Sequence, residues 1–593
     1  MRDSTATGFM KSIFVILLMT IAFINHAQDL SERIRLNQIG YYPHAKKIAI
    51  VETDGISDFY IQAVGDNSKI LSGKLSEPRK SEFSEKKLCV ADFTSFTKSG
   101  NYILVVEGVG KSYPFEIKDN VHNSVSKGSI LGFYYQRAST PLSEKFAGKW
   151  HRAMGHPDAH VFVHPSAASD KRPEGTIISS PKGWYDAGDY NKYIVNSGIT
   201  MATLLSAYED YPIYYDALEL TIPENRNKLP DLLDEALWNL RWMLTMQDPN
   251  DGGVYHKLTN ANFDKFVMPD KATAKRYVVQ KGTAATLDFA AVMAQASRVL
   301  KKFDKQLPGL SDSCITAAKE AWVWATKNPN VVYDQNVFNK RLDPDITTGG
   351  YGDQNFSDEV IWAACELYAT TKDEQYVKGI GTVPDKLDLP GWNQVQSLGY
   401  YTLIRLEKEL PVTISPLTSA LKKKIINYAK ELVQGVDQRS FITVIGGSSK
   451  DFIWGSSSVA ANQGIVLLQA YRISKDKKYV DYALTNLDYL LGRNGTGYSF
   501  VTGYGDKPPM HIHHRPSEAD GIADPVPGLL SGGPNPGRQD GCSYSTSVAN
   551  EAFLDDVCSY ATNEIAINWN APLVYLVGGI EALQYEIGYS EKK

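Results

Sequence analysis

Two aspartates three residues apart form the first group in the chain whose spacing could do chemistry. Asp186 and Asp189 lie in GWYDAGDYNKY, residues 183–193, between aromatic residues and glycines. Acidic side chains usually occupy hydrated surfaces, so the pattern is also typical of a surface turn or a calcium loop. Two carboxylates that face one water molecule could instead orient it and remove its proton. That chemistry would need further polar groups from elsewhere in the chain.

A second segment, YSFVTGYGDKPPMHIHHRPSEADG (residues 498–521), gathers histidines and an arginine among glycines and prolines. It contains His511, His513, His514 and Arg515. A histidine cluster of this kind could bind zinc. The competing interpretation is a polar substrate pocket, in which imidazole and guanidinium groups donate hydrogen bonds to hydroxyls.

A third segment, FLDDVCSYATNEIAINWNAPL (residues 553–573), supplies Asp555 and Glu564. Asp555 or Thr562 could cap a helix, and Glu564 could complement the helix dipole in the first turn. Apolar neighbours, with Trp569 nearby, could also keep Glu564 protonated near neutral pH. A protonated carboxyl and a separate carboxylate are what glycoside hydrolysis needs, because one protonates the leaving oxygen and the other activates water.

The composition sets limits on the function. The chain has 593 residues, of which 43% are hydrophobic, enough for one large core and a smaller domain. Its net charge of −5 indicates no nucleic-acid partner. Tyrosine is frequent, with 34 residues, and flat aromatic rings suit both a core and the apolar face of a sugar.

The N-terminus resembles an export signal. SIFVILLMTIAFI, residues 12–24, follows Arg2 and Lys11 and is too short to span a membrane. We therefore predict a signal peptide at 1–27 and a mature protein that is secreted or periplasmic, without a membrane span and monomeric. Five cysteines are far apart, and only Cys542 and Cys558 are a plausible disulfide pair.

The periodicity changes once along the chain. Residues 28–118 contain about six short alternating runs separated by turn residues, which predicts an immunoglobulin-like β-sandwich. Residues 119–593 show about eleven amphipathic helical patterns, of which LPDLLDEALWNLRWMLTMQ (229–247) is the clearest. The others lie near 122–137, 192–209, 280–301, 313–327, 357–371, 393–408, 416–435, 459–474, 478–491 and 567–585. Their number favours a toroid of paired helices, with the site on the connecting loops.

The three motifs together resemble glycoside hydrolase family 9, a cellulase group with an (α/α)6 barrel and, in one subgroup, an N-terminal immunoglobulin-like domain. YDAGDY matches the family's DAGD motif. SFVTGYGDKPPMHIHHR (499–515) matches its histidine signature, and FLDDVCSYATNEIAINWNA (553–571) matches its acidic signature. The opening of the β-domain, IRLNQIGYYPHAKKIAIV, is also similar to that subgroup.

The resemblance implies catalytic roles. Glu564 is the expected general acid, Asp189 the base that takes a proton from water, and Asp186 a helper that orients the water. Asp555 would be an accessory carboxylate, and His513 would act beside the scissile bond. The family inverts the anomeric configuration, which implies an acid–base separation of roughly 6.5–9.5 Å.

The expected substrate contacts come from the same loops. Arg515 would bind substrate beside the scissile bond, and His514 is assigned to binding with it. Four aromatic side chains are candidates for sugar stacking, each with a place in the core as the alternative: Trp184, Trp454, Tyr498 and Trp569.

The sequence departs from its relatives at a structural zinc site. Ala138 and Gly155 stand where relatives with the β-domain often carry cysteines, and only His156 remains. Two missing thiolates leave too few ligands for a closed tetrahedral site, so we predict no zinc.

Calcium is a separate expectation. GGYGDQNFSDEVIW (349–362) resembles a family calcium loop, with Asp353, Ser357, Asp358 and Glu359 as oxygen ligands. The alternative is a helix N-cap at Ser357 or Asp358 with acids in the first turn. No cofactor is expected for catalysis.

The leading hypothesis is an exported, inverting endoglucanase that cleaves β-1,4-glucosidic bonds of cellulose or related glucans. An exo-acting β-glucosidase or glucosaminidase on oligosaccharides is the second enzyme hypothesis. A carbohydrate-binding relative that has lost catalysis is the third. We expect the β-domain to stabilise the helical domain, because it has no aromatic stripe suited to sugar binding.

Overall fold

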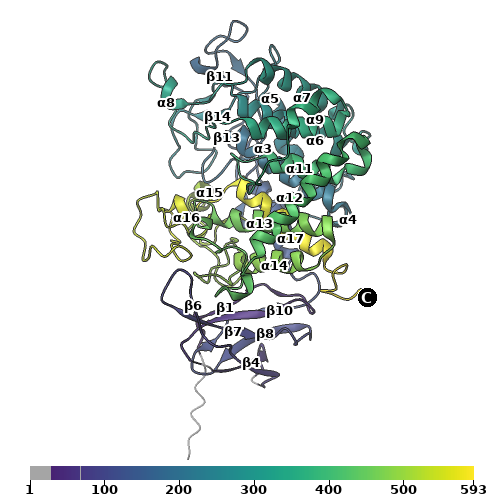
Figure 1. Ribbon diagram of the computed structural model, residues 1–593. Coiled ribbons are helices and arrows are strands. Elements are labelled where there is room, and N and C mark those ends of the chain that lie inside the picture. Colours follow the sequence, from purple (N-terminus) through teal and green to yellow (C-terminus); the bar gives the residue numbers. More distant parts are fainter. Residues whose placement is uncertain (1–28, 56, 67, 593) are drawn as a thin grey trace, which may run out of the picture.

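The computed structural model describes residues 29–592 except 56 and 67, so the predicted signal peptide lies outside the described residues. Figure 1 shows a small β-domain at one end of the molecule and a larger helical domain above it. None of the helices in the described ranges has the length and apolar character that crossing a membrane requires.

The N-terminal domain is a β-sandwich, as predicted. One sheet has the order β1 (Ile34–Arg35), β3 (Ile48–Glu52), β7 (Lys87–Asp92) and β6 (Arg79–Lys80). The second has the order β2 (Gly40–Tyr41), β10 (Phe115–Ile117), β8 (Gly100–Val106), β4 (Asp58–Ala63) and β5 (Leu71–Lys74), with β9 (Gly110–Lys111) on β8. Side chains that alternate along these strands, such as Val51, Phe59, Leu104 and Phe115, form the core between the sheets.

Each amphipathic segment of residues 119–593 contains a helix. The long helices are α1 (Asn123–Tyr135), α3 (Ile194–Asp210), α5 (Asp231–Thr245), α6 (Thr283–Leu300), α7 (Leu310–Lys327), α9 (Ser357–Thr371), α11 (Gln396–Arg405), α12 (Ser415–Val433), α13 (Ser456–Ser474), α14 (Lys478–Leu490) and α17 (Ile567–Leu583). Short helices connect them: α2 (Glu144–Ala147), α4 (Pro212–Ala217), α8 (Gln335–Phe338), α10 (Val377–Ile380), α15 (Arg515–Ala519) and α16 (Tyr560–Asn563).

The long helices close into a ring. Helix α3 packs on α6, α6 on α9, α9 on α11, α11 on α12, α12 on α13, α13 on α17, and α17 returns to α3. Almost every residue of α3 and α6 and most residues of α13 are buried, which places these helices inside the domain. Helix α12 buries only one face and α7 leaves one face partly exposed, so they cover the inner helices from outside.

The helical domain also carries a small sheet that the sequence did not predict. Its order is β12 (Ile177–Ile178), β11 (Val161–Val163), β15 (Arg276–Val278), β14 (Lys257–Asn260) and β13 (Lys192–Tyr193). These strands are two to four residues long, too short for alternation to be recognised. Strand β13 leads directly into α3, so the sheet borders the loop that carries Asp186 and Asp189.

Part of the β-domain packs into the core of the helical domain, apart from the core between its own two sheets. Tyr42, Ala45 and Ile48 of the β-domain belong to the same buried cluster as the helices. Buried polar contacts cross the boundary: the Asn37 amide donates to Asp488 Oδ1 at 2.8 Å, and the Tyr42 hydroxyl donates to Glu581 Oε1 at 2.6 Å. The β-domain is therefore packed against the helical domain, and its stabilising role stays a prediction.

Candidate active site

The loop with the two aspartates is fixed by backbone hydrogen bonds. The Asp186 N–H donates to the Asn191 carbonyl at 3.0 Å, which closes the turn onto β13. The Asp186 carbonyl accepts the Ile567 N–H at 2.8 Å, which ties the loop to the start of α17. Because α17 begins within the acidic motif, three residues after Glu564, this bond holds the two motifs together.

Gly188 lets the histidine motif approach the aspartate loop. A Cβ at this position would lie 2.0 Å from the His513 carbonyl oxygen, so only glycine fits. The Gly188 carbonyl accepts the Arg515 N–H at 3.1 Å and an Arg515 guanidinium N–H at 2.8 Å. Close backbone approach, rather than a positive φ, is thus the reason for this glycine.

Glu564 reaches the same place from the other side. His513 and Glu564 form a parallel β-bridge, and the His513 N–H donates to the Asn563 carbonyl at 3.0 Å. Glu564 Oε1 accepts the Gly188 N–H at 3.4 Å. The three motifs, far apart in the sequence, therefore meet at one point.

The surroundings of Glu564 favour its protonated form. Burial and the nearby charges of Asp189 and Asp186 raise the pKa of the Glu564 carboxyl well above its ordinary value. Burial and the charge of Asp189 also raise the pKa of Asp186, to about 8. Asp186 accepts hydrogen bonds from the Asn196 amide at 3.0 Å and the Tyr351 hydroxyl at 3.2 Å.

Asp189 is arranged differently from its neighbours. Its Oδ2 accepts hydrogen bonds from the Asn191 amide at 2.5 Å and the Tyr193 hydroxyl at 3.2 Å. Its Oδ1 is buried and, among the described residues, has no hydrogen-bond partner. Donated hydrogen bonds stabilise a carboxylate, and the free oxygen remains available to a water molecule.

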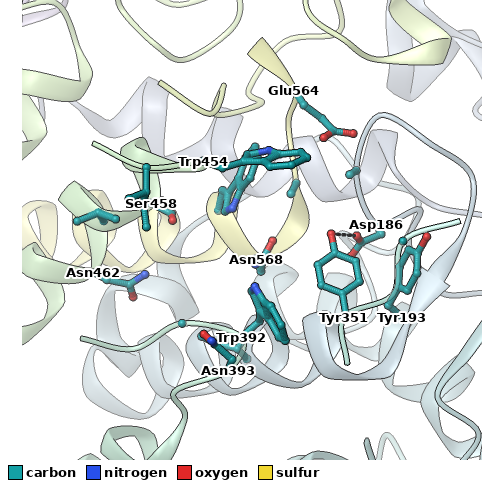
Figure 2. Close-up of a pocket in the computed structure, with 18 of the residues that line it drawn as sticks. Asp186, Tyr193, Tyr351, Trp392, Asn393, Trp454, Ser458, Asn462, Glu564 and Asn568 are labelled. Atoms are coloured by element: carbon teal, nitrogen blue, oxygen red, sulfur yellow. Dashed lines mark hydrogen bonds between the residues drawn. The ribbon is translucent and has the colours of Figure 1, made fainter. Parts of the chain in front are cut away.

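These carboxyls line a pocket of about 970 Å³, at the upper end of the range of roughly 300–1,000 Å³ for small-molecule sites. Figure 2 shows Glu564 and Asp186 at one end and Trp454 and Trp392 along the wall. Trp454, on the loop before α13, is 41% exposed, so its ring can receive a ligand. The sequence argument included Trp454, Trp569, His513 and Arg515, which all line the pocket.

Several lining residues were missed. Trp392, Tyr351, Tyr428 and Tyr560 contribute rings to the wall, and Asn462 and Asn568 contribute amides. Tyr560 and Asn568 belong to the acidic motif, where only its acids and Trp569 were singled out. Trp392, Tyr351, Tyr428 and Asn462 lie outside the three motifs, on loops and helices that the fold brings together. Among these four, Tyr351 has a sequence signal, because it follows the glycine pair in the segment considered for calcium.

Two of the stacking candidates are corrected. Trp184 is fully buried, and its indole N–H donates to Glu235 Oε1 at 2.8 Å, so it belongs to the core. Tyr498 packs against Phe553, with ring centroids 5.0 Å apart, and does not line the pocket. For both residues, the alternative of a place in the packed interior holds.

His514 and Asp555 also lie behind the pocket wall. His514 is buried, and its Nε2 lies 3.0 Å from Gln136 Oε1, so it does not face a substrate as expected. Asp555 accepts the backbone N–H groups of Met510 and His511 at 2.9 Å each. Its carboxylate therefore anchors the histidine motif and does not line the pocket.

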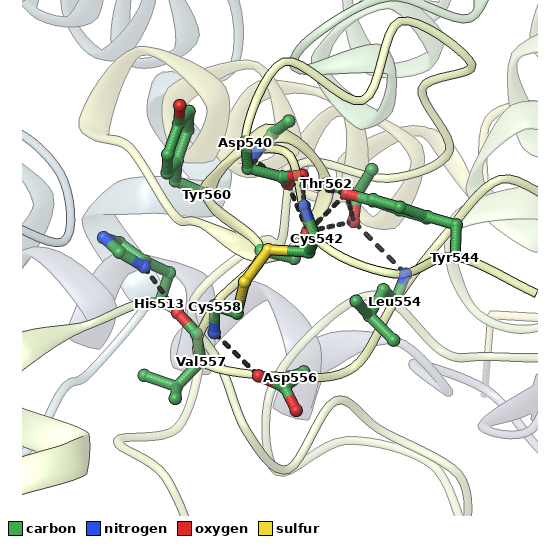
Figure 3. The surroundings of a disulfide bond; sticks show 12 residues. His513, Asp540, Cys542, Tyr544, Leu554, Asp556, Val557, Cys558, Tyr560 and Thr562 are labelled. Atoms are coloured by element: carbon green, nitrogen blue, oxygen red, sulfur yellow. Dashed lines mark hydrogen bonds between the residues drawn. A yellow bond between two sulfur atoms is a disulfide. The ribbon is translucent and has the colours of Figure 1, made fainter.

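The predicted cysteine pair forms a disulfide beside the site. Cys542 and Cys558 are bonded, with their Cα atoms 6.2 Å apart, as Figure 3 shows. The residue before Cys558 is Val557, whose carbonyl accepts the His513 Nδ1 proton at 2.6 Å. This contact leaves His513 Nε2 to face the pocket.

Apolar packing occupies the segment considered for zinc. Ala138 packs with Tyr185, Tyr190 and Ala272. A Cβ at Gly155 would lie 2.4 Å from the Pro269 side chain, so a cysteine there would require movement. The structure thus accommodates Ala138 and Gly155 at the positions where relatives often carry cysteines. The absence of zinc stays a prediction.

The segment considered for calcium holds a cluster of buried acids. Neither Ser357 nor Asp358 caps α9, because the N-cap residue is Phe356, so that part of the alternative is wrong. The other part is confirmed, because Asp358 and Glu359 lie in the first turn of α9. Asp288 of α6 was missed: burial and the charges of Asp358 and Asp353 raise its pKa well above the ordinary value. Both Asp288 carboxylate oxygens lack a hydrogen-bond partner in the described chain. Its only sequence signal was an acid within a largely apolar stretch of helix.

The acids of this cluster raise one another's pKa. Burial and Asp288 raise the pKa of Glu359 to about 11. Across residues 29–592, without 56 and 67, no group of three or more His, Cys, Asp or Glu side chains is placed to hold a metal ion.

Comparison with known proteins identifies both domains. The profile of glycosyl hydrolase family 9 matches residues 122–577, and that of the cellulase N-terminal ig-like domain matches residues 29–111. The chain is 46% identical to the xyloglucan-specific endo-β-1,4-glucanase of Bacteroides ovatus over 555 residues, which cover 93% of this chain and 94% of that protein. It is 34% identical to endoglucanase D of Acetivibrio thermocellus, covering 99% of this chain and 86% of that protein.

Solved structures give the same result. A family 9 structure from Bacteroides ovatus superimposes with a TM-score of 0.89 at 45% identity, covering 93% of this chain and 100% of that chain. A thermostable endoglucanase from Alicyclobacillus acidocaldarius superimposes with a TM-score of 0.81 at 29% identity, covering 93% of this chain and 99% of that chain. The motifs, the arrangement of the domains and these similarities establish that the chain is a member of glycosyl hydrolase family 9.

Proposed function

We propose that this protein is an endo-β-1,4-glucanase that hydrolyses its substrate with inversion. Glu564 donates a proton to the leaving glycosidic oxygen, and Asp189 removes a proton from the attacking water. Asp186 sits beside Asp189, and its pKa of about 8 means that it holds its own proton at neutral pH. His513 and Arg515 contact the substrate beside the reacting bond.

One observation carries this proposal: a buried carboxyl with a raised pKa and a hydrogen-bonded carboxylate line one pocket. Because the environments of Glu564 and Asp189 differ in this way, we assign Glu564 as the acid and Asp189 as the base. Inversion requires room for water between Glu564 and Asp189, hence the expected separation of roughly 6.5–9.5 Å. Trp454, Trp392 and Trp569 extend the pocket wall away from the acids and suit successive sugar rings.

We propose xyloglucan as the first substrate to test. The support is the 46% identity to an endoglucanase whose name specifies that polysaccharide. Linear cellulose and mixed-linkage β-glucan are the comparison substrates.

The experiment follows the anomer and the product lengths by proton NMR and chromatography. Initial α-anomer and a range of product lengths support inversion and endo action. Initial β-anomer contradicts Asp189 as the base that activates water. Release of single terminal units alone would favour the exo-acting hypothesis.

The Glu564→Gln variant tests the third hypothesis, a binding protein without catalysis. Hydrolysis should fall by at least about 100-fold, the usual contribution of a general acid, while sugar binding survives. Unchanged hydrolysis would contradict the role of Glu564. Binding without hydrolysis in the unmodified protein would favour the binding relative.

We also propose a structural calcium ion at the acidic cluster. Asp288, Asp353, Asp358 and Glu359 each have a buried carboxylate oxygen without a hydrogen-bond partner in the described chain. Hard oxygen donors fit calcium, which would neutralise these buried charges and tie α6 to α9. Chelation should lower the melting temperature of the unmodified protein and leave that of Asp288→Asn unchanged. An equal effect on both proteins would contradict the site.

The remaining assignments are proposals as well. The closed ring of helices supports an (α/α)6 barrel, with domain limits at 28–118 and 119–593. The disulfide supports export, because such bonds persist in oxidising compartments. We propose a monomer whose signal peptide ends at residue 27, and the mass and N-terminal sequence of the native protein test both statements.

A further inference from the structure

Lys257 on β14 is a fully buried lysine close to the candidate active site. Its ammonium group donates to Gln335 Oε1 at 2.9 Å, Thr348 Oγ1 at 2.8 Å and the Gly349 carbonyl at 2.6 Å. All three acceptors are neutral. Within the described residues Lys257 forms no ion pair, whereas the buried Lys192 pairs with Asp158 at 2.7 Å. Burying a charge without a paired carboxylate is costly, so its position calls for a functional reason.

Hydrogen bonds connect this cation to Asp189. Thr348 Oγ1 accepts from Lys257 and lies 2.6 Å from Thr259 Oγ1. The Thr259 hydroxyl donates to Asn191 Oδ1 at 2.9 Å, and the Asn191 amide donates to Asp189 Oδ2 at 2.5 Å. If Thr348 donates to Thr259, every donor in the chain points from the lysine toward the carboxylate.

A second path runs through an aromatic ring. The Lys257 nitrogen lies 5.4 Å from the centroid of the Tyr193 ring, within the range of a cation–π contact. The Tyr193 hydroxyl donates to the same Asp189 oxygen at 3.2 Å. Both donors to Asp189 are thus connected to Lys257: Tyr193 by direct contact with its ring, and Asn191 through Thr259 and Thr348.

From these contacts we infer that Lys257 is a positioning residue for the catalytic base: its buried positive charge orients Asn191 and Tyr193 and keeps Asp189 ionised. The inference rests on the proposed role of Asp189. It deepens that role by giving the base an electrostatic counterpart outside the three sequence motifs.

The charge balance around Asp189 favours this role. The carboxyls that interact with it are Asp186, Asp264 and Glu564. Tyr193, Tyr351 and His513 also face it, and Lys257 is the lysine that interacts with it. Arg515 lies near Glu564 and Asp264. Without Lys257, fewer positive charges would offset the carboxyls around Asp189.

Protonation of the lysine agrees with the proposed role. Burial lowers the pKa of Lys257 to about 7, against the attraction of Asp189. The ammonium group is therefore charged throughout the acidic range, in which the base must lose its proton. Its charge favours the carboxylate form of Asp189, so removing it should move the acidic limb of the kcat profile to higher pH.

The test is the pH profile of kcat for Lys257→Met, with Lys47→Met as the matched control. Lys47 is also fully buried and donates only to neutral acceptors, the Pro43 and Ala45 carbonyls at 2.6 and 2.9 Å, but it lies in the β-domain. We expect K257M to lower kcat about tenfold, leave KM within twofold and raise the acidic limb by about one pH unit. K47M should leave the limb in place, even if it lowers the melting temperature.

A second variant separates charge from hydrogen bonding and serves if K257M does not fold. Lys257→Gln removes the charge but keeps a donor, and it should show the same shift of the acidic limb. A folded K257M or K257Q with the wild-type limb overturns the inference. Asp189→Asn is measured in parallel: if it keeps full activity, the proposed base itself fails. If D189N is inactive and the Lys257 variants have the wild-type limb, only the inference about Lys257 fails.

Discussion

Replacing Gly188 with alanine tests whether close backbone approach builds the active site. The added Cβ would lie 2.0 Å from the His513 carbonyl oxygen, about 1.4 Å inside the 3.4 Å at which ordinary contact begins. That oxygen belongs to the backbone, so it cannot turn away as a flexible side chain would. The aspartate loop and the histidine motif must therefore move apart by about an ångström.

Such a movement separates the proposed base from the proposed acid. Gly188 lies next to Asp189, and its N–H donates to Glu564. A misplacement of about 1 Å can cost roughly 100-fold in rate, so we expect kcat of Gly188→Ala to fall about 100-fold. The assay is steady-state hydrolysis of a soluble β-1,4-glucan, with the melting temperature measured on the same preparation.

Gly350→Ala is the matched control, because Gly350 borders the same pocket and a Cβ there meets only the Gln335 side chain, at 4.0 Å. It should keep kcat within about twofold. A folded G188A enzyme with the kcat of the wild type would refute the reasoning. Equal losses in both variants would show that any added methyl group in this pocket is harmful.

Three further outcomes follow from the site. Asp186 is charged above its pKa of about 8, and that charge raises the pKa of Glu564, so Asp186→Asn should move the basic limb of the kcat profile, where the acid loses its proton, to lower pH; an unmoved limb in the pH series contradicts this electrostatic coupling. Replacing both Cys542 and Cys558 with serine removes the disulfide, which closes a loop of sequence separation 16. The free energy of unfolding, measured by urea titration, should fall by about 3 kcal/mol. An unchanged midpoint would show that the bond adds no stability. Trp454→Ala should raise KM about tenfold, or ~1.4 kcal/mol, with kcat nearly unchanged, because its exposed ring is offered to a sugar away from the acids; an unchanged KM contradicts the stacking role.

The sequence predicted those parts of the molecule in which one short segment contains the whole signal. Helices such as α5 and α12 have an apolar face with a period of 3.6 residues over many turns, and both form where expected. Asp186 and Glu564 were found because acids among aromatic and apolar residues violate the usual preference for hydrated surfaces.

Other parts could not be predicted because their environment forms only on folding. The same pattern of aromatic residues beside the aspartates contains Trp184, which is core, and no local feature distinguishes it from the exposed Trp454. Asp288 is the one acidic residue of α6, and its significance comes from Asp358 of another helix. Lys257 stands in an unrecognised strand of four residues.

The geometry of the candidate site depends on backbone contacts more than on the side chains that carry the chemistry. The Asp186 carbonyl binds the first residue of α17, the Gly188 carbonyl binds Arg515, and His513 pairs with Glu564 as a β-bridge. These bonds fix the three segments before any carboxyl is placed. The carboxyls can therefore stay buried and close to one another, although burial and like-charge repulsion are unfavourable, because the backbone contacts hold them in place. Variation at the surrounding rings would change substrate preference while the acid, the base and their spacing stay the same.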